Sequence, residues 1–259
     1  MSDIQSAFDH GKAFIAFVTG GDPSLEKTEE FVLEIIRAGA DLIEIGIPFS
    51  DPIAEGPVIQ QASHRALSVG TNVDGLFDLV FSIRKKTDVP IVFMTYLNPV
   101  FHYGYDNFFK KCQNAGINGI IIPDLPFEEK REVSSVSEMY GVDVISLVAP
   151  TSEERIEMIA KDAKGFLYVV SSMGVTGIRS EIKTDIGLMV EIARSVTKIP
   201  VAVGFGISTS EQAESMGKLA DGVIVGSAIV KIISEYGENA GPFVYDYVKK
   251  MKEAVEKCD

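Results

Sequence analysis

Asp41-Leu-Ile-Glu-Ile-Gly-Ile-Pro-Phe-Ser-Asp-Pro-Ile-Ala-Glu-Gly-Pro57 is the stretch that decides the fold. Residues 42–47 are apolar and rich in isoleucine, which is typical of a buried strand, yet they include the carboxylate Glu44. An isolated carboxylate on such a strand is costly unless it is neutral, paired or used. The loop that follows adds two more acids, Asp51 and Glu55. Acids gathered at the end of a strand are typical of β/α enzymes, so the stretch predicts a strand–loop–helix unit that carries chemistry.

The same order of strand, loop and helix recurs about eight times along the chain. The expected strands are short and apolar on both faces, as in a parallel sheet covered by helices. They are predicted at residues 13–18, 42–47, 91–96, 119–122, 142–148, 166–170, 201–203 and 222–225. Helices are expected between them, including residues 107–115 and 128–140, with a short additional one at residues 4–8. The 259 residues therefore predict an α/β protein, a single-domain (β/α)8 TIM barrel over residues 1–259 with extra short helices.

Composition narrows the classes of partner. The net charge is −13, which argues against nucleic acid and anionic membranes as partners, because both require clustered lysine and arginine. The negative net charge does not exclude an anionic small substrate, because backbone N–H groups at the binding site can outweigh the effect of more distant acidic side chains. The two cysteines, Cys112 and Cys258, predict neither a disulfide framework nor a zinc site. The first ten residues do not resemble a signal peptide and no apolar run is long enough to span a bilayer, so we expect a soluble, cytoplasmic protein.

The acid set Glu44, Asp51 and Glu55 is the first candidate for chemistry. Side chains alternate along a strand, so Glu44 shares a face with Leu42, and we expect that face to look into the barrel near its mouth. In that low dielectric the pKa of Glu44 should rise, which suits proton transfer near neutral pH. The alternative is an acid paired with an inward lysine or arginine, but no predicted strand contains either. For Asp51 the alternative is a turn or capping acid.

Three glycine-rich turns follow the sixth, seventh and eighth predicted strands, at residues 174–177, 204–206 and 226–227. Glycine lets backbone N–H groups approach a ligand closely, and a helix N-terminus adds partial positive charge. Phosphate in such barrels frequently binds after strands seven and eight, and Ser227 adds a hydroxyl donor there. Turns between strands and helices need glycine in any case, so it is the succession of three that favours a phosphate site.

Other candidate residues are fewer. Tyr168 lies on the sixth predicted strand and could face the mouth beside Glu44, although an ordinary core tyrosine is the alternative. The histidines, His10, His64 and His102, fall outside the strand ends, where surface positions are expected. No cluster has metal-ligand spacing, so no metal site is predicted, and no nucleophile elbow or P-loop occurs.

Seven motifs, taken together, resemble one known family, that of the tryptophan synthase α subunit. They occur in family order and span nearly the whole chain: Phe17-Val-Thr-Gly-Gly-Asp-Pro23, Glu44-Ile-Gly-Ile-Pro-Phe-Ser-Asp-Pro-Ile-Ala-Glu-Gly-Pro-Val-Ile-Gln60, Met94-Thr-Tyr-Leu-Asn-Pro-Val-Phe101, Pro123-Asp-Leu-Pro126, Ser171-Ser-Met-Gly-Val-Thr-Gly177, Gly204-Phe-Gly-Ile-Ser208 and Gly226-Ser-Ala-Ile-Val-Lys-Ile232.

The resemblance implies a (β/α)8 lyase that cleaves indole-3-glycerol phosphate to indole and glyceraldehyde 3-phosphate in tryptophan biosynthesis. It implies that Glu44 is the catalytic glutamate, with Tyr168 beside it, and that Glu55 binds the indole N–H where the family usually has aspartate. The other implied positions are the phosphate cradle of Gly177, Gly206, Gly226 and Ser227, the indole-pocket residues Phe17 and Tyr96, the lid over residues 172–186 with Thr176, and the partner-contact residues Ser50 and Asp51.

The resemblance also implies an α2β2 assembly with a tryptophan synthase β subunit. Pyridoxal phosphate is expected in that partner, and no cofactor is expected in this chain. Two alternatives stay open on the sequence: a stand-alone indole-3-glycerol phosphate lyase, and a subunit that mainly activates the β partner.

Overall fold

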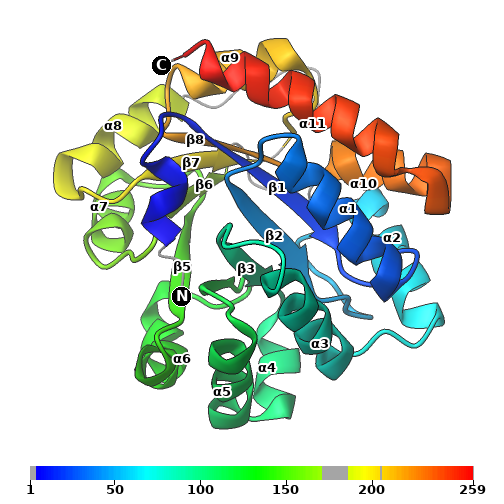
Figure 1. Ribbon diagram of the computed structural model, residues 1–259. Coiled ribbons are helices and arrows are strands. Elements are labelled where there is room, and N and C mark those ends of the chain that lie inside the picture. Colours follow the sequence, from blue (N-terminus) through cyan, green and yellow to red (C-terminus); the bar gives the residue numbers. More distant parts are fainter. Residues whose placement is uncertain (1–3, 171–185, 205, 259) are drawn as a thin grey trace.

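A computed structural model describes residues 4–170, 186–204 and 206–258 of the chain. Eight parallel strands follow one another in sequence order and close into a barrel, with helices around the outside (Figure 1). The strands are β1 Ala13–Thr19, β2 Leu42–Gly46, β3 Ile91–Met94, β4 Gly119–Ile121, β5 Asp143–Val148, β6 Leu167–Val170, β7 Val201–Gly204 and β8 Gly222–Val225. The predicted TIM barrel is therefore confirmed.

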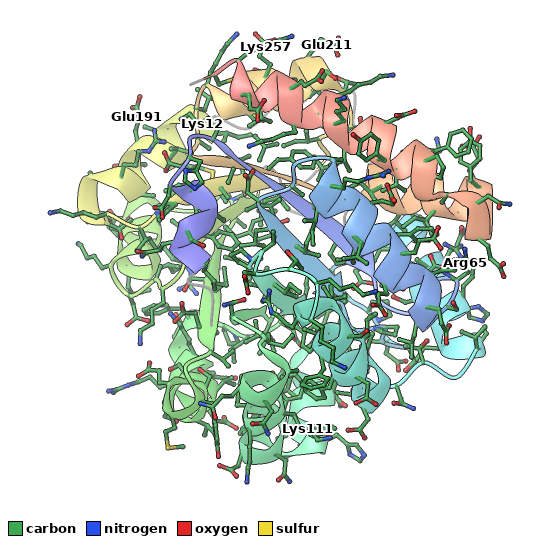
Figure 2. All side chains as sticks on the ribbon, viewed as in Figure 1. Lys12, Arg65, Lys111, Glu191, Glu211 and Lys257 are labelled. Carbon is green, nitrogen blue, oxygen red and sulfur yellow. The ribbon has the colours of Figure 1, made fainter. Side chains whose placement is uncertain are left out.

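The helices form the outer layer (Figure 1). The α-helices are α1 Leu25–Arg37, α2 Pro57–Ser68, α3 Val73–Arg84, α4 Leu97–Tyr103, α5 Tyr105–Ala115, α6 Lys130–Ser137, α7 Glu153–Lys161, α8 Ile186–Val196, α9 Ser210–Gly217, α10 Ser227–Tyr236 and α11 Gly241–Glu256. Short 3-10 helices are η1 Ile4–Phe8, η2 Phe127–Glu129, η3 Glu138–Tyr140 and η4 Gly237–Asn239. Figure 2 shows charged side chains such as Lys111 and Glu211 at the periphery of this layer.

Two predicted elements differ in detail. Residues 95–99 were expected to complete the third strand and its turn, but β3 ends at Met94 and α4 begins at Leu97. Pro99 lies in the first turn of α4, where its missing N–H costs no helical hydrogen bond, so the proline marks a helix start rather than a loop. The expected helix 128–140 is split into η2, α6 and η3. Within the described residues, no single helix is long and apolar enough to cross a membrane.

Alternation along the strands divides the core into two layers. Leu42 joins an interior cluster with Ile15, Val92 and Ile224, all of which point into the barrel. Their strand neighbours, such as Ile43 and Ile45, belong to the outer cluster that packs against the helices. Because each strand is buried on both faces, even a single polar residue on it faces either the barrel interior or the helix layer.

The N-terminal end of the barrel is closed by η1. Ile4 and Ala7 belong to the interior cluster, and Phe8 packs against it. Two strand glycines make room for this plug: a Cβ on Gly119 would lie 2.9 Å from Cδ1 of Ile4, and one on Gly222 would lie 2.9 Å from Cε1 of Phe8. The opposite, C-terminal end carries the loops in which the site residues were predicted.

Candidate active site

Glu44 projects from β2 into the barrel interior. It shares the face of Leu42 and lies in register with Phe17 of β1 and Val92 of β3. The side chain is buried, with 1% of the residue exposed, and its Oε1 has no hydrogen-bond partner among the described residues. Burial raises the pKa of Glu44 to about 8. The alternative of an inward lysine or arginine partner is therefore not realised in the described structure, and a carboxyl with this pKa is largely protonated at neutral pH.

Tyr168 lies on β6 and belongs to the same interior layer. Burial raises the pKa of its phenol well above the usual value, and the charge of Glu44 raises it further, which places the two side chains near each other. Gly204 on the neighbouring strand β7 makes room for the tyrosine, because a Cβ there would lie 2.5 Å from its hydroxyl oxygen. Tyr168 and Glu44 therefore share the interior layer of the barrel, and the role of Tyr168 in the site stays a prediction.

Phe17 forms a wall of the mouth at the end of β1. Two glycines lie against its ring: a Cβ on Gly46 would lie 2.7 Å from Cζ, and one on Gly226 would lie 3.2 Å from Cβ of Phe17. The ring packs with Ile59 of α2 and Val230 of α10. Glycines at the ends of β2 and β8 thus allow a large apolar ring to sit beside the carboxyl of Glu44.

Glu55 and Tyr96 meet at the loop that follows β2. The backbone N–H of Ala54 donates to the Tyr96 hydroxyl oxygen at 3.0 Å, and Gln60 Nε2 donates to the Glu55 carbonyl at 2.7 Å. Burial raises the pKa of Glu55 to about 7, opposed by a hydrogen bond from the Tyr96 hydroxyl. Its Oε2 has no partner within the described part of the chain. The Glu55 carboxyl is therefore hydrogen-bonded to Tyr96, while its other hydrogen-bonding capacity is unused among the described residues.

The glycine turns after β7 and β8 lie at the same end of the barrel, because these strands are parallel neighbours. Gly206 has a φ of 79°, a left-handed conformation that suits glycine. Gly226 is the N-cap residue of α10 and Ser227 its first residue; no side-chain cap hydrogen bond occurs at this N-terminus among the described residues, and both residues are half-buried. Gly177 and Thr176 lie outside the described residues.

The predicted partner-contact residues lie on an exposed loop. The Ser50 hydroxyl donates to Asp51 Oδ2 at 2.5 Å, so Asp51 is engaged locally, as a turn acid would be. Two large apolar side chains that follow β2 and β3 face solvent: Ile53 is 73% exposed and Phe101 of α4 is 67% exposed. The Phe49 ring packs against Tyr96 at a centroid distance of 5.4 Å, which connects the exposed loop to the Glu55 region.

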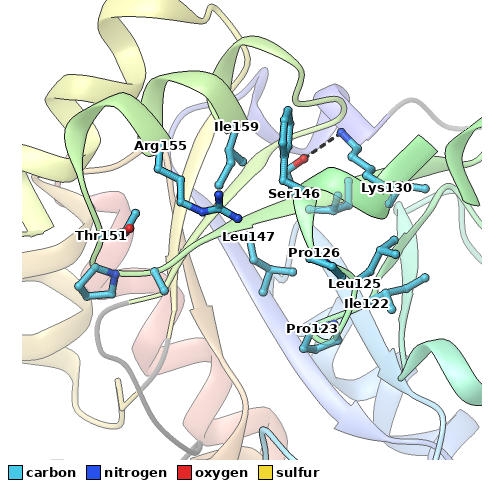
Figure 3. A pocket seen from close by; sticks show the side chains of 15 residues that line it. Ile122, Pro123, Leu125, Pro126, Lys130, Ser146, Leu147, Thr151, Arg155 and Ile159 are labelled. Atoms are coloured by element: carbon cyan, nitrogen blue, oxygen red, sulfur yellow. Dashed lines mark hydrogen bonds between the residues drawn. The ribbon is translucent and has the colours of Figure 1, made fainter. Parts of the chain in front are cut away.

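A separate hollow of about 310 Å³ lies beyond the ends of β4 and β5 (Figure 3). Its wall includes Pro126, Leu147 and Arg155, and the buried Lys130 donates to Ser146 Oγ at 3.0 Å beside it. None of the predicted site residues that the structure describes lines it. The hollow is therefore distinct from the candidate site residues that the structure describes at this end of the barrel.

Sequence reasoning missed the contacts that brace the site. Arg65 of α2 binds Asp22 through two hydrogen bonds, from Nε at 2.8 Å and from Nη2 at 2.7 Å, and Asp22 is buried. This pair ties the loop after β1 to the helix that follows Glu55. The histidines are exposed, as expected, and no group of three metal-ligating side chains occurs among the described residues.

Comparison with known proteins gives consistent results. The sequence model of the tryptophan synthase alpha chain family matches residues 5–257. The tryptophan synthase alpha chain of Lacticaseibacillus casei is 47% identical over 256 residues, covering 99% of this chain and 96% of the relative. That of Alkaliphilus metalliredigens is 50% identical over 222 residues, covering 86% of this chain and 84% of the relative.

Solved structures agree with the sequence comparisons. The crystal structure of the tryptophan synthase alpha chain from Legionella pneumophila superposes with a TM-score of 0.89 at 35% identity, covering 99% of this chain and 98% of that one. The tryptophan synthase complex from Pyrococcus furiosus includes a chain with a TM-score of 0.87 at 36% identity, covering 94% of this chain and 99% of that one.

Proposed function

This chain belongs to the tryptophan synthase alpha chain family, and from that premise we propose that Glu44, Glu55 and the glycine turns form its active site. The reaction is the retro-aldol cleavage of indole-3-glycerol phosphate to indole and glyceraldehyde 3-phosphate. The observation that carries the assignment is Glu44: a carboxyl buried in the barrel beside Tyr168 and near the mouth, with one oxygen that has no partner among the described residues.

Glu44 carries the proton through the cycle. Cleavage requires that indole C3 gain a proton and that the glycerol hydroxyl lose one as the C–C bond breaks. Because its pKa is raised to about 8, Glu44 is protonated at neutral pH and donates to C3. The resulting carboxylate then accepts the hydroxyl proton as indole leaves. The residue ends in the form in which it began, so no other proton carrier is required.

Glu55 stabilises the charged intermediate. Protonation at C3 places positive charge on the indole ring, and a carboxylate beside the ring N–H stabilises that charge. The carboxyl of Glu55 is held beside Tyr96 and has a free oxygen within the described structure to receive the N–H. Its pKa of about 7 leaves a substantial fraction ionised at neutral pH. Phe17 and Tyr96 supply the apolar walls for the ring.

The phosphate end binds across the mouth. The turn that contains Gly206 and the N-terminus of α10 at Gly226 and Ser227 offer backbone N–H groups and partial positive charge. Gly177 would complete the cradle and Thr176 would belong to the lid, as the family resemblance implies. Binding of the phosphate group, which does not react, orients the reacting carbons of the substrate toward Glu44.

The assembly follows from the product. Indole is apolar and diffuses readily, so we propose that it passes to a tryptophan synthase β subunit that holds pyridoxal phosphate, in an α2β2 complex. Ser50 and Asp51, with the exposed Ile53 and Phe101, supply a mixed polar and apolar contact surface of the kind that partners bury. We further propose that the chain works in the cytoplasm as one barrel domain; neither of its two cysteines takes part in a disulfide within the described structure, which agrees with a reducing compartment.

Indole release tests the proposal. The purified chain is incubated with indole-3-glycerol phosphate, alone and with a β subunit, and indole is quantified. We expect release that increases when the partner is added, and none from Glu44→Gln under either condition. Full activity without a partner would favour a stand-alone lyase, whereas no release in the presence of the partner would leave only an activating role. Glu253→Gln, an exposed acid on α11, is the control.

A further inference from the structure

The turn after β7 is held by two side chains from outside the barrel. The backbone N–H of Ser208 donates to Gln212 Oε1 of α9 at 2.8 Å, and the Tyr247 hydroxyl of α11 donates to the Ser208 carbonyl at 3.0 Å. Both backbone polar groups of one residue are therefore bound by side chains. Ser208 is two residues from Gly206, so these bonds fix the downstream end of the glycine turn.

Each of these two side chains is itself held. Gln212 Oε1 also accepts from the Thr209 backbone N–H at 3.2 Å, as part of a capping box at the start of α9. Tyr247 is half-buried, and burial raises the pKa of its phenol, so the hydroxyl stays protonated and available as a donor. Helix α11 packs along both α9 and α1 (Figure 1), which anchors the tyrosine to the outer layer.

The bonds matter because of what the turn carries. The backbone at Gly206 has a φ of 79°, which glycine adopts readily because it lacks a Cβ. For the same reason a glycine backbone is freer to change conformation than that of other residues. An N–H group that binds an anion contributes most when its direction is set before the anion arrives. Fixing Ser208 on both sides reduces the freedom of Gly206 and keeps the turn beside the N-terminus of α10.

We propose that Tyr247 and Gln212 are positioning residues for the phosphate end of the substrate, acting through Ser208 on the Gly206 turn. This inference rests on the proposed function, since it requires that the turn bind phosphate. Neither side chain touches the substrate. Through Tyr247 the position of α11 influences the affinity for phosphate, and through Gln212 the N-terminal cap of α9 influences the same affinity.

Tyr247→Phe tests the inference because it removes the hydroxyl and keeps the ring. KM for indole-3-glycerol phosphate should rise about fivefold, the factor expected for one lost hydrogen bond, and kcat should stay unchanged. The affinity for inorganic phosphate, measured as competitive inhibition, should fall by the same factor. Gln212→Met, which keeps the length and loses the acceptor, should act in the same direction.

Tyr245→Phe is the matched control. It lies two residues earlier on α11, and its ring contacts the Arg37 guanidinium, at 4.5 Å from Cζ to the ring centroid, which does not require the hydroxyl. Its KM and phosphate affinity should equal those of the wild type. Unchanged KM and phosphate affinity in both Tyr247→Phe and Gln212→Met, with or without a lower melting temperature, would overturn the inference and leave the bonds a purely structural role.

Glu44→Gln separates this failure from failure of the proposed function. That variant should lose cleavage and keep the wild-type affinity for inorganic phosphate, which isothermal titration calorimetry measures without turnover. A wild-type chain that neither cleaves the substrate nor binds phosphate would remove the proposed function and the inference together. A wild-type chain that does both, with Tyr247→Phe and Gln212→Met indistinguishable from it, would remove the inference alone.

Discussion

The half of the mouth built on β1–β3 differs from the half built on β7 and β8 in how its polar groups are satisfied. Four buried side-chain oxygens lack a hydrogen-bond partner in the described structure, and all four belong to the first half: Thr19 Oγ1, Glu44 Oε1, Glu55 Oε2 and Thr95 Oγ1. In the second half, Ser208 has its backbone N–H and carbonyl bound by side chains. Unpaired buried groups destabilise the fold, whereas paired ones set geometry.

This contrast separates chemistry from binding. A carboxyl that transfers a proton must keep an oxygen free and a raised pKa, so its burial costs stability. A phosphate cradle made of backbone N–H groups needs no ionisable side chain, only a fixed direction. We therefore expect substitutions in the first half to change turnover and stability in opposite directions, and substitutions in the second half to change affinity.

The largest expected effect is on Glu44. Its folded pKa of about 8 lies above the ordinary 4.5, so between these values the folded chain keeps a proton that the unfolded chain releases. Stability is therefore lost as pH rises through this window. Glu44→Gln should remove that loss and stabilise the chain more at pH 9 than at pH 5.5, by on the order of 3 kcal/mol, while turnover falls at least about 10³-fold.

Urea unfolding at the two pH values measures this difference, with Glu253→Gln as the exposed control. Equal stabilisation at both pH values would show that Glu44 does not titrate in this window. A Glu44→Gln variant that is no more stable at pH 9 than the wild type would show that the buried carboxyl is satisfied in solution, and the contrast between the two halves would disappear.

Glu55 should give the next largest effect. Glu55→Gln keeps the size of the side chain and removes the negative charge that the protonated indole requires, so kcat should fall about 10²-fold. The affinity for inorganic phosphate should stay unchanged, because the proposed cradle lies on the other half of the mouth. Steady-state kinetics with phosphate as a competitive inhibitor measure both. A Glu55→Gln variant with normal kcat would remove Glu55 from the reaction.

The comparison also shows how far the sequence predicts the site. Alternation along residues 42–46 places Glu44 inside the barrel because the strand period leaves only two faces, and the structure agrees. The bracing contacts were not predictable in the same way. Tyr247 and Ser208 are 39 positions apart, and Arg65 and Asp22 are 43 apart, so each pair meets only when helices dock on the barrel. No local pattern marks such a meeting.

Helix α4 shows a second limit. Thr95 and Tyr96 continue the β-branched and aromatic character of β3, and the local sequence favours an extended chain at these two residues, followed by a turn. The structure instead starts a helix at Leu97, whose backbone N–H donates to Asp124 Oδ1 at 2.9 Å. Asp124, which follows the next strand β4, thus caps the start of this helix. The position of the helix start is therefore set by a tertiary contact and not by the local sequence.

Substitution of Tyr96 should change activity least, but it should change one specific feature, the rising limb of the pH profile. Its hydroxyl bond lowers the pKa of Glu55, which burial raises to about 7. Glu55 must be ionised and Glu44 protonated, so activity should rise with pH near 7 and fall near 8. Tyr96→Phe removes the bond and keeps the ring, which raises the pKa of Glu55 and moves only the rising limb to higher pH.

The charged groups that face Tyr96 are Glu55 and Asp124, so Asp124→Asn serves to test whether that second acid moves the same limb. A profile of kcat/KM in which Tyr96→Phe moves the falling limb, or neither limb, would mean that Tyr96 does not act through Glu55 and is only a wall of the indole pocket.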